Sequence, residues 1–331
     1  MRLLRRIVLT LAILAAAAGA AAVASPWPSA LAIRALFEAG AASTRAAQAP
    51  FLPQGLGERT DLAWDAAHPQ GRLDLFLPPG EVPAAGWPVV VWVHGGAWVS
   101  GSKDEVSNYL RILAGRGVAT VGVGYPLSPG ARHPEPARHV LRALDWLAAH
   151  GAGLGIDPAR MVLAGDSAGA QIAAQAGIAL TDPGYAARLG AAPALPAGNL
   201  RGLVLFCGGM GLAGMPDRGL GGLFIRAVVF AHFGSRSLTG VPDLDLFEIA
   251  PNLHAGMPPL FLSVGNADPL RAPTFAVADR AAALGITTDT LFYPPDHQPP
   301  LGHEYQFDLT TPEGQAALDR ASAFVASVTA P

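Results

Sequence analysis

Cysteine, lysine and charge are all scarce in this sequence of 331 residues. Cys207 is the single cysteine, Lys103 is the single lysine, and only 14% of the residues are charged. One cysteine cannot build a disulfide framework or a cysteine-based metal site. The net charge of −3, without any cluster of basic residues, argues against a nucleic-acid partner. Because 51% of the residues are hydrophobic, the sequence predicts a folded body rather than a disordered chain.

The N-terminus has the charge order of a targeting segment. Three arginines within the first six residues precede an uncharged run over residues 7–24. This order is typical of a secretory signal peptide, and AVA at 22–24 resembles a cleavage site. The run is also long enough for an uncleaved membrane anchor, and a buried alanine-rich helix is the remaining alternative. With either targeting segment the arginines stay in the cytoplasm, so we expect the body to be exported.

Strand-like and helix-like patterns alternate along most of the chain. Short apolar, β-branched runs indicate strands, and apolar residues three and four apart indicate helices. This alternation predicts an α/β fold with a mostly parallel central sheet and helices on both faces. Residues 50–70, rich in proline and glycine, are expected to be linker or edge structure. The expected strands are 72–77, 88–93, 118–125, 161–165, 200–208, 258–265 and 287–293, and the expected helices are 30–40, 106–116, 136–150, 168–180, 272–284 and 312–328.

Residues 208–257 interrupt the alternation. An ordinary connection has about 4–6 residues, so this stretch is far longer than a loop. It contains the apolar segment GLGGLFIRAVVFAHFG at 219–234. We expect a cap over one end of the sheet. A membrane-dipping segment is the alternative, which Arg226 and His232 disfavour because they interrupt the apolar run.

A serine between two glycines lies where a predicted strand meets a predicted helix. Gly165, Ser167 and Gly169 follow the G-x-S-x-G pattern after strand 161–165. Such a tight turn strains the serine backbone and projects its hydroxyl from the carboxyl edge of the sheet, above a helix N-terminus. The pattern is short and the chain has 39 glycines, so the strand and helix around it carry the prediction. Ser167 is the candidate nucleophile.

A nucleophilic serine needs backbone N–H donors for the oxyanion that forms on its substrate. Ala168 directly follows the serine and is one expected donor. The stretch HGGAW at 94–98 leaves a buried strand, and Gly95 and Gly96 there allow the backbone to approach a substrate carbonyl closely. His94 comes before the serine in the chain, so we expect it to support this loop rather than act as the base.

The acid of a serine triad is expected after the serine, at a later strand end. Asp268 follows strand 258–265 in SVGNADPL and is the candidate acid. Its alternative role is to cap a turn ahead of the following proline. Asp243 and Asp245 fall inside the expected cap, where no strand fixes them. Asp166 adjoins the nucleophile, and we expect it to brace the turn by hydrogen bonds.

The loop after the last predicted strand holds two histidines. His303 lies in LGHEYQFD beside aromatic residues, and His297 lies among prolines in PPDHQPP. We favour His303 as the base. His133 and Glu135 suggest a metal pair, but an intervening proline and the lack of a third nearby ligand favour a structural loop.

Four stretches together resemble the hormone-sensitive-lipase-like esterases of the α/β-hydrolase superfamily. They are HGGAW at 94–98, YPLSPGARHPEPARHVLRALDWL at 125–147, GDSAG at 165–169 and LGHEYQFD at 301–308. The resemblance covers roughly residues 60–328 and implies the α/β-hydrolase fold. It implies a catalytic triad of Ser167, Asp268 and His303, and an oxyanion hole formed by the N–H groups of Gly95, Gly96 and Ala168.

The resemblance also implies a domain organisation. A signal peptide or anchor (1–24) precedes a helix and linker (25–60) that contribute to the cap, and the catalytic domain spans 61–331 with its cap insertion at about 208–257. Ala97 replaces the usual third glycine of the family, which leaves the acyl preference open.

The implied activity is hydrolysis of small-molecule carboxylic esters through an acyl-enzyme, without a cofactor. An amidase or formamidase-like hydrolase, an interfacial lipase and a non-catalytic binding protein on the same fold are the alternatives. The natural substrate and the oligomeric state stay open at this point.

Overall fold

The fold is described from a computed structural model, which covers residues 2–237, 240–241 and 243–330. Eight strands form one sheet in the order β1-β2-β4-β3-β5-β6-β7-β8. β2 pairs antiparallel with β1 and with β4, and the other neighbouring strands are parallel. The predicted α/β class with a mostly parallel sheet is confirmed. The strands are β1 (Gly57–Ala63), β2 (Arg72–Leu77), β3 (Trp87–Val93), β4 (Ala119–Val123), β5 (Ile156–Asp166), β6 (Leu200–Phe206), β7 (Leu260–Val264) and β8 (Thr288–Phe292).

The central strands are apolar because both faces of the sheet are buried. In β3, Val89, Val91 and Val93 enter the core on one face, and Val90 and Trp92 enter the core on the other. Side chains alternate between the two faces of a strand, so a strand covered on both sides needs a continuous apolar run. The run PVVVWV meets this need.

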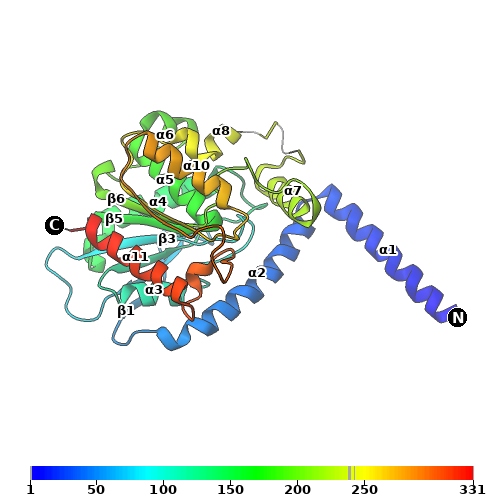
Figure 1. Cartoon of the computed structure of the whole chain (residues 1–331), viewed down its shortest axis with the longest axis horizontal. Helices are drawn as coiled ribbons and strands as arrows, with labels where there is room; N and C mark the ends of the chain where they lie inside the picture. Colours follow the sequence, from blue (N-terminus) through cyan, green and yellow to red (C-terminus); the bar gives the residue numbers. More distant parts are fainter. Residues whose placement is uncertain (1, 238–239, 242, 331) are drawn as a thin grey trace.

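Helices cover both faces of the sheet (Figure 1). α3 and α11 contribute apolar side chains to the core on one face, and α4, α5 and α10 contribute to the core on the other. The helices of this part of the chain are α3 (Ser107–Ala114), α4 (Glu135–His150), α5 (Ser167–Thr181), α6 (Pro183–Leu189), α10 (Arg271–Ala283) and α11 (Pro312–Val328), with 3-10 helices η1 (Ala49–Phe51), η2 (Gly151–Leu154), η3 (Ala197–Asn199) and η4 (Tyr305–Phe307).

Two parts of the N-terminal half differ from the prediction. β1 lies within residues 50–70 and is the outermost strand, with mostly exposed side chains, so no hydrophobic alternation marks it. The helix expected at 30–40 is longer and spans Trp27–Gln48 as α2. Gly40 lies inside this helix rather than at its end. No atom outside the helix backbone lies within 4 Å of the position that a Cβ on Gly40 would take.

Two helices cover the carboxyl edge of the sheet. α2 lies beside α7 (Gly219–Phe233), and the rings of Phe37 and Phe224 join them with centroids 6.1 Å apart. The second part of the 208–257 stretch, with α8 (Leu244–Phe247) and α9 (Ile249–Asn252), packs into the core against α5 instead. The cover is therefore made from two segments far apart in the sequence.

α2 is fixed to the sheet domain by buried polar contacts. The guanidinium of Arg34 donates to the carbonyl oxygens of Val99 and Ser128. The amide of Gln48 donates to the carbonyl oxygen of Phe307 over 3.0 Å. These contacts hold the first half and the C-terminal end of the covering helix in place.

α1 (Arg2–Ala24) projects from the body as a single helix (Figure 1). Its segment Leu4–Ala24 is long and apolar enough to cross a membrane, and none of that segment is buried. A signal sequence has the same length and composition.

The single lysine holds the antiparallel edge of the sheet to the loop that precedes α3. Lys103 Nζ lies 2.8–2.9 Å from carboxylate oxygens of Asp61, Asp74 and Asp104. Burial acts to lower the pKa of Lys103, but the three carboxylates outweigh it and raise the pKa above its ordinary value. The Asp74 side chain is only 3% exposed, and Lys103 is the cation that pairs with it.

Replacing Lys103 by methionine is expected to destabilise the fold by about 3–5 kcal/mol, because a buried carboxylate loses its cation. The midpoint and slope of urea unfolding measure the change. The matched variant Asp104→Asn removes an exposed partner and is expected to cost about 1 kcal/mol or less. Equal effects of the two variants would contradict the role assigned to the buried pair.

Candidate active site

Ser167 lies on a sharp turn at the carboxyl edge of the sheet. β5 ends at Asp166 and α5 begins at Ser167, whose φ is +51°. A Cβ on Gly169 would lie 2.0 Å from the carbonyl oxygen of Val93, so the first turn of α5 can approach β3 only with glycine there. The turn presents the serine hydroxyl at the N-terminus of α5, as the sequence pattern predicts.

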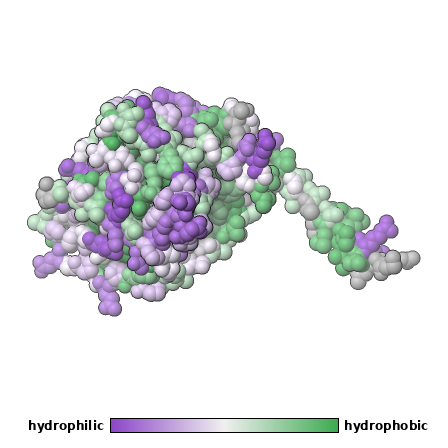
Figure 2. Space-filling view, viewed as in Figure 1, coloured by the Kyte–Doolittle hydropathy of each residue, from purple (hydrophilic) through white to green (hydrophobic). Residues whose placement is uncertain are grey.

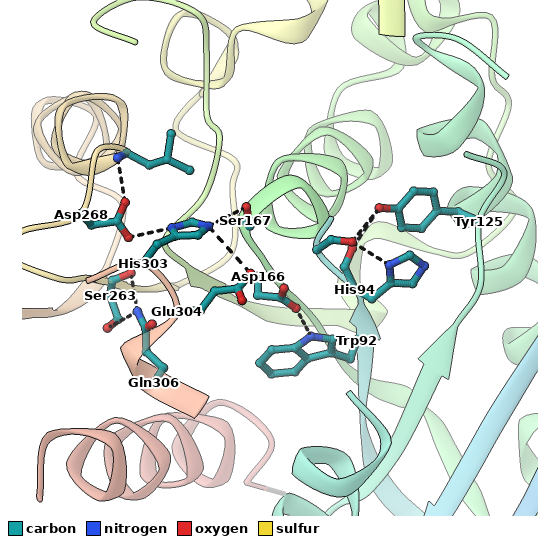
Figure 3. Close-up of polar contacts among 12 residues, drawn as sticks. Trp92, His94, Tyr125, Asp166, Ser167, Ser263, Asp268, His303, Glu304 and Gln306 are labelled. Atoms are coloured by element: carbon teal, nitrogen blue, oxygen red, sulfur yellow. Dashed lines mark hydrogen bonds and ion pairs between the residues drawn. The ribbon is translucent and has the colours of Figure 1, made fainter. Parts of the chain in front are cut away.

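Ser167, His303 and Asp268 form one hydrogen-bonded chain (Figure 3). Ser167 Oγ lies 3.0 Å from His303 Nε2, and His303 Nδ1 lies 2.9 Å from Asp268 Oδ2. Because a carboxylate only accepts, Nδ1 carries the ring proton and Nε2 accepts from the serine hydroxyl. The N–H of Leu270 donates to Asp268 Oδ1 over 2.7 Å and fixes the carboxylate. The structure brings the three candidate residues together.

The loop that carries His303 is tied to β7. Gln306 Nε2 donates to the carbonyl oxygen and to the hydroxyl of Ser263, and Tyr305 shares a hydrogen bond of 2.9 Å with the same hydroxyl. Asp268 follows the same strand. The acid and the histidine are therefore positioned from one strand end, although 35 residues separate them.

The pKa of His303 is raised well above its ordinary value. Burial of the ring acts to lower it, but the Cys207 sulfur, the Asp268 carboxylate and the Glu304 carboxylate outweigh burial. Burial raises the pKa of the Cys207 thiol to about 11, so the thiol is neutral at physiological pH. The two carboxylates are then the anions that stabilise the imidazolium, the form that the ring takes when Nε2 also carries a proton.

Sequence reasoning missed two residues that contact this histidine. Cys207 directly follows β6, so the rule that strand ends meet at one edge could have found it. Glu304 has a φ of +62°, and its Oε1 lies 3.8 Å from His303 Nε2. No sequence pattern indicates that the residue next to this histidine has a positive φ.

The stretch HGGAW forms a tight turn after β3. Gly96 has a φ of +112°, and a Cβ there would lie 2.2 Å from the carbonyl oxygen of Ser100. Within the described part of the chain, the N–H groups of Gly96 and Ala97 have no hydrogen-bond partner. His94 stacks on Tyr125 with ring centroids 4.2 Å apart, and burial lowers its pKa to about 4. This neutral histidine supports the loop.

Asp166 connects the serine turn to this loop. Its carboxyl accepts from Trp92 Nε1 over 2.7 Å (Figure 3). Burial raises the pKa of Asp166 well above its ordinary value, the neighbouring Glu304 carboxylate raises it further, and the backbone N–H of Gly95 acts to lower it. This expected oxyanion donor therefore interacts with Asp166 electrostatically, although no hydrogen bond of ordinary geometry joins the two among the described residues.

A cavity of about 480 Å³ lies above the serine. Its floor is polar, with Ser167, His303 and Glu304, and α2 and α7 form its roof. A mostly apolar pocket with a few converging polar groups is the usual form of a small-molecule site. The apolar side chains around it include Leu36, Phe37, Trp98, Met215, Phe224, Ile225, Val228 and Leu270.

The remaining candidate residues lie elsewhere. His297 Nε2 contacts Glu313 over 3.1 Å and does not join the chain of hydrogen bonds. Asp243 precedes α8, and Asp245 pairs with Arg188. His133 bonds Gln175, whereas Glu135 pairs with Arg142, so the two do not converge on a shared metal position.

Among the described residues, one cluster has metal-ligating types. Ligand atoms of Cys207, Asp268 and His303 all lie within 4.8 Å of one another. Both ring nitrogens of His303 already face Ser167 and Asp268, so the ring has no nitrogen left for an ion. We interpret the cluster as part of the hydrogen-bonded chain.

A family model described as alpha/beta hydrolase fold matches residues 90–297. The chain belongs to the α/β-hydrolase fold family. The carboxylesterase NlhH of Mycobacterium tuberculosis is 29% identical to this hydrolase over 265 residues, covering 75% of this chain and 77% of the relative. The ethyl acetate hydrolase of Pseudomonas putida is 37% identical over 100 residues, covering 30% and 31% of the two chains. The resemblance to hormone-sensitive-lipase-like esterases is confirmed.

Solved structures show the same fold. Esterase B from Lactobacillus rhamnosis superposes on this hydrolase with a TM-score of 0.75 at 23% identity, covering 91% of this chain and 96% of the other. An esterase from Pyrobaculum calidifontis has a TM-score of 0.72 at 21% identity, with 91% and 94% covered. The fold of this hydrolase is therefore a known architecture.

Removing the Glu304 charge is expected to lower the pKa of His303, because one anion beside the imidazole disappears. An NMR titration of the His303 ring in Glu304→Gln, assigned against His303→Ala, measures the shift to lower pH. The matched control Glu313→Gln removes a carboxylate that contacts His297 instead, and it should leave the His303 titration unchanged. A His303 titration that is the same in Glu304→Gln and wild type would contradict this account.

Proposed function

We propose that this hydrolase cleaves carboxylic esters through a covalent acyl-enzyme on Ser167. The hydrogen-bonded chain from Asp268 through His303 to Ser167, at the floor of an apolar cavity, carries this proposal. The family of the chain and the printed names of its relatives, a carboxylesterase and an ethyl acetate hydrolase, support an ester as the substrate class. The ordered triad and the cavity argue against a binding protein without catalytic activity.

The reaction proceeds in two halves. Ser167 Oγ attacks the ester carbonyl carbon while His303 Nε2 takes the hydroxyl proton, and the carbonyl oxygen becomes an oxyanion. The oxyanion collapses, the bond to the alcohol oxygen breaks, and His303 returns its proton to the departing alcohol. Water then attacks the acyl-enzyme with His303 as base, which releases the carboxylic acid and restores the serine. Asp268 keeps the tautomer and stabilises the imidazolium.

Backbone N–H groups around the serine stabilise the oxyanion in this mechanism. The expected set was Gly95, Gly96 and Ala168. We take Gly96 and Ala168 as the main donors of this set, because the Gly95 N–H also interacts with the Asp166 carboxyl. Ala97 adds a third candidate, because it lines the cavity and its N–H has no partner in the described part of the chain. Such donors lower the barrier most when they are fixed before the substrate binds.

The cavity supports an ester with an apolar acyl group. Its volume of about 480 Å³ falls within the usual range of about 300–1,000 Å³ for small-molecule sites. Trp98, Phe224 and Ile225 bound it with apolar surface, which favours hydrocarbon chains over charged groups. The reaction uses only protein groups, so no cofactor enters the proposal.

We propose that the catalytic domain acts outside the cytoplasm. The support is α1, an exposed apolar helix that follows an arginine-rich start and fits both a cleaved signal peptide and a retained anchor. Mass spectrometry of the mature N-terminus distinguishes the two, because cleavage after Ala24 removes α1. A full-length chain in the cytoplasmic fraction would contradict export.

Replacing Ser167 by alanine is expected to lower kcat for p-nitrophenyl butyrate by about 10⁴-fold or more, because the acyl-enzyme cannot form. Stopped assays of p-nitrophenol release measure the loss, with circular dichroism to show that the fold persists. Wild-type activity in the alanine variant would refute a serine mechanism.

Variants of the two histidines in the last loop test which of them is the base. His303→Ala is expected to reduce kcat about as much as Ser167→Ala, because the two residues act as one unit. His297→Ala is the matched control and should keep kcat within about threefold, since its ring contacts Glu313 rather than the serine. Loss of activity in the His297 variant alone would move the base to that residue.

A further inference from the structure

Exposed apolar side chains gather on the outside of the cover. Apart from Phe51, Leu52 and Val82, every exposed large hydrophobic side chain among the described residues belongs to α1, α2 or α7. Leu220 and Leu223 of α7 are 86% and 66% exposed. The outer face of the cover is defined by these two leucines together with Trp27 and Leu31 of α2.

The helices with this outer face also form the roof of the catalytic cavity. Phe224 and Ile225 of α7 line the cavity, whereas Leu220 and Leu223 do not. The start of α7 is therefore apolar on the side toward the cavity and on the side toward the surroundings, and Arg226 is the exposed charged residue of the helix. Apolar side chains on the outer side of a helix are stable when they are buried or in contact with lipid, and an arginine beside them suits the head-group layer. The outer face has no protein neighbour in the described chain that removes it from water.

The position of α1 indicates what covers this outer face. Only Ser25 and Pro26 separate the end of α1 at Ala24 from the start of α2 at Trp27. Two residues reach about 7 Å at most, so a bilayer that holds α1 lies directly against the cover. Arg236, in the loop after α7, donates to the carbonyl oxygen of Ala24, which also places the end of α1 beside α7. Figure 2 shows hydrophobic residues along α1 and at the place where it meets the body.

The cover cannot turn away from such a bilayer without breaking contacts. Arg34 and Gln48 tie the first half and the C-terminal end of α2 to the sheet domain. Trp27, at the junction of α1 and α2, and the exposed Arg218 before α7 are residue types that favour the head-group layer of a membrane. The junction between α1 and α2 therefore fixes the orientation of the catalytic domain relative to the bilayer.

We infer that the outer face of α2 and α7 docks on the lipid bilayer and that the cavity receives carboxylic esters carried in that bilayer. The inference rests on the proposed esterase function and specifies its substrate class as apolar, lipid-borne esters such as acylglycerols. An apolar ester that enters the cavity from the membrane does not have to pass through water. Esters dissolved in water still reach the serine, because the cavity is open.

Activity assays on the full chain, reconstituted in vesicles of phosphatidylcholine and phosphatidylglycerol, test the substrate class. Dioleoylglycerol in the same vesicles is the lipid-borne ester, and p-nitrophenyl butyrate is the soluble one. The double variant Leu220→Gln/Leu223→Gln is expected to hydrolyse dioleoylglycerol at least tenfold more slowly and p-nitrophenyl butyrate within twofold of wild type. Val82→Gln is the matched control, since Val82 is exposed and contacts Gly155 at the opposite, amino edge of the parallel strands.

The outcomes separate this inference from the proposed function. A wild-type protein that hydrolyses neither ester refutes the esterase itself. A wild-type protein that cleaves only the soluble ester overturns the lipid-borne substrate. Equal rates for the double variant and wild type on dioleoylglycerol overturn docking through α7, and so does a parallel loss on both esters, which would place the leucines in the cavity's own function.

A fluorescent label tests docking without any activity. Cys207 is buried, so a nitrobenzoxadiazole label attaches to a new surface cysteine in Leu223→Cys and, as the control, in Val82→Cys. In vesicles the label at 223 is expected to shift to the blue and to be quenched by lipids with spin labels on their acyl chains, and the label at 82 is not. Identical spectra at the two positions would overturn the docking.

Discussion

The turn between β5 and α5 is the constraint on which the rest of the site depends. It holds Ser167 at a φ of +51°, a left-handed conformation that costs roughly 1–2 kcal/mol for an L-residue. Burial of α5 along almost its whole length offsets that strain. Gly169 lies so close to the end of β3 that a single methyl group would collide with the carbonyl oxygen of Val93. One contact therefore positions both the nucleophile and the HGGAW loop, so the serine and its backbone donors cannot shift independently.

Three carboxyl groups surround this turn, and their environments divide their roles. Asp268 accepts hydrogen bonds from the N–H of Leu270 and from the Nδ1–H of His303, so both of its oxygens are held in place. Asp166 is buried next to Glu304, and both effects raise its pKa, so it connects Trp92 and Gly95 as a structural group. Carboxyl groups of one site take different parts when their surroundings separate their pKa values. Glu304 raises the pKa of Asp166 and of His303 alike, so it links these two residues electrostatically.

Local patterns in the sequence predicted the parallel strands, the nucleophile turn and the residues at the strand ends. These features are recoverable because a buried parallel strand needs an apolar run, and because carboxyl ends of parallel strands meet at one edge. The remaining features depend on tertiary contacts, which local sequence patterns do not contain. β1 has mostly exposed side chains and only its pairing with β2 defines it. The direction of the Gly95 N–H toward Asp166 and the turn of Glu304 toward His303 follow from backbone angles that no residue type specifies.

The cover was the hardest part to read from the sequence, for a related reason. α7 is apolar apart from Arg226 and His232, and hydropathy alone does not distinguish a helix that lines a cavity from one that contacts a bilayer. The structure shows that α7 has both kinds of side, with Phe224 toward the cavity and Leu220 toward the surroundings. A water-soluble cover would need mostly polar residues on its outer side, and the chain places Leu220 and Leu223 there beside Arg226. Exposed leucines are costly in water and favourable against lipid, so the property that obscures α7 in the sequence is also the one on which the inferred docking at a bilayer depends.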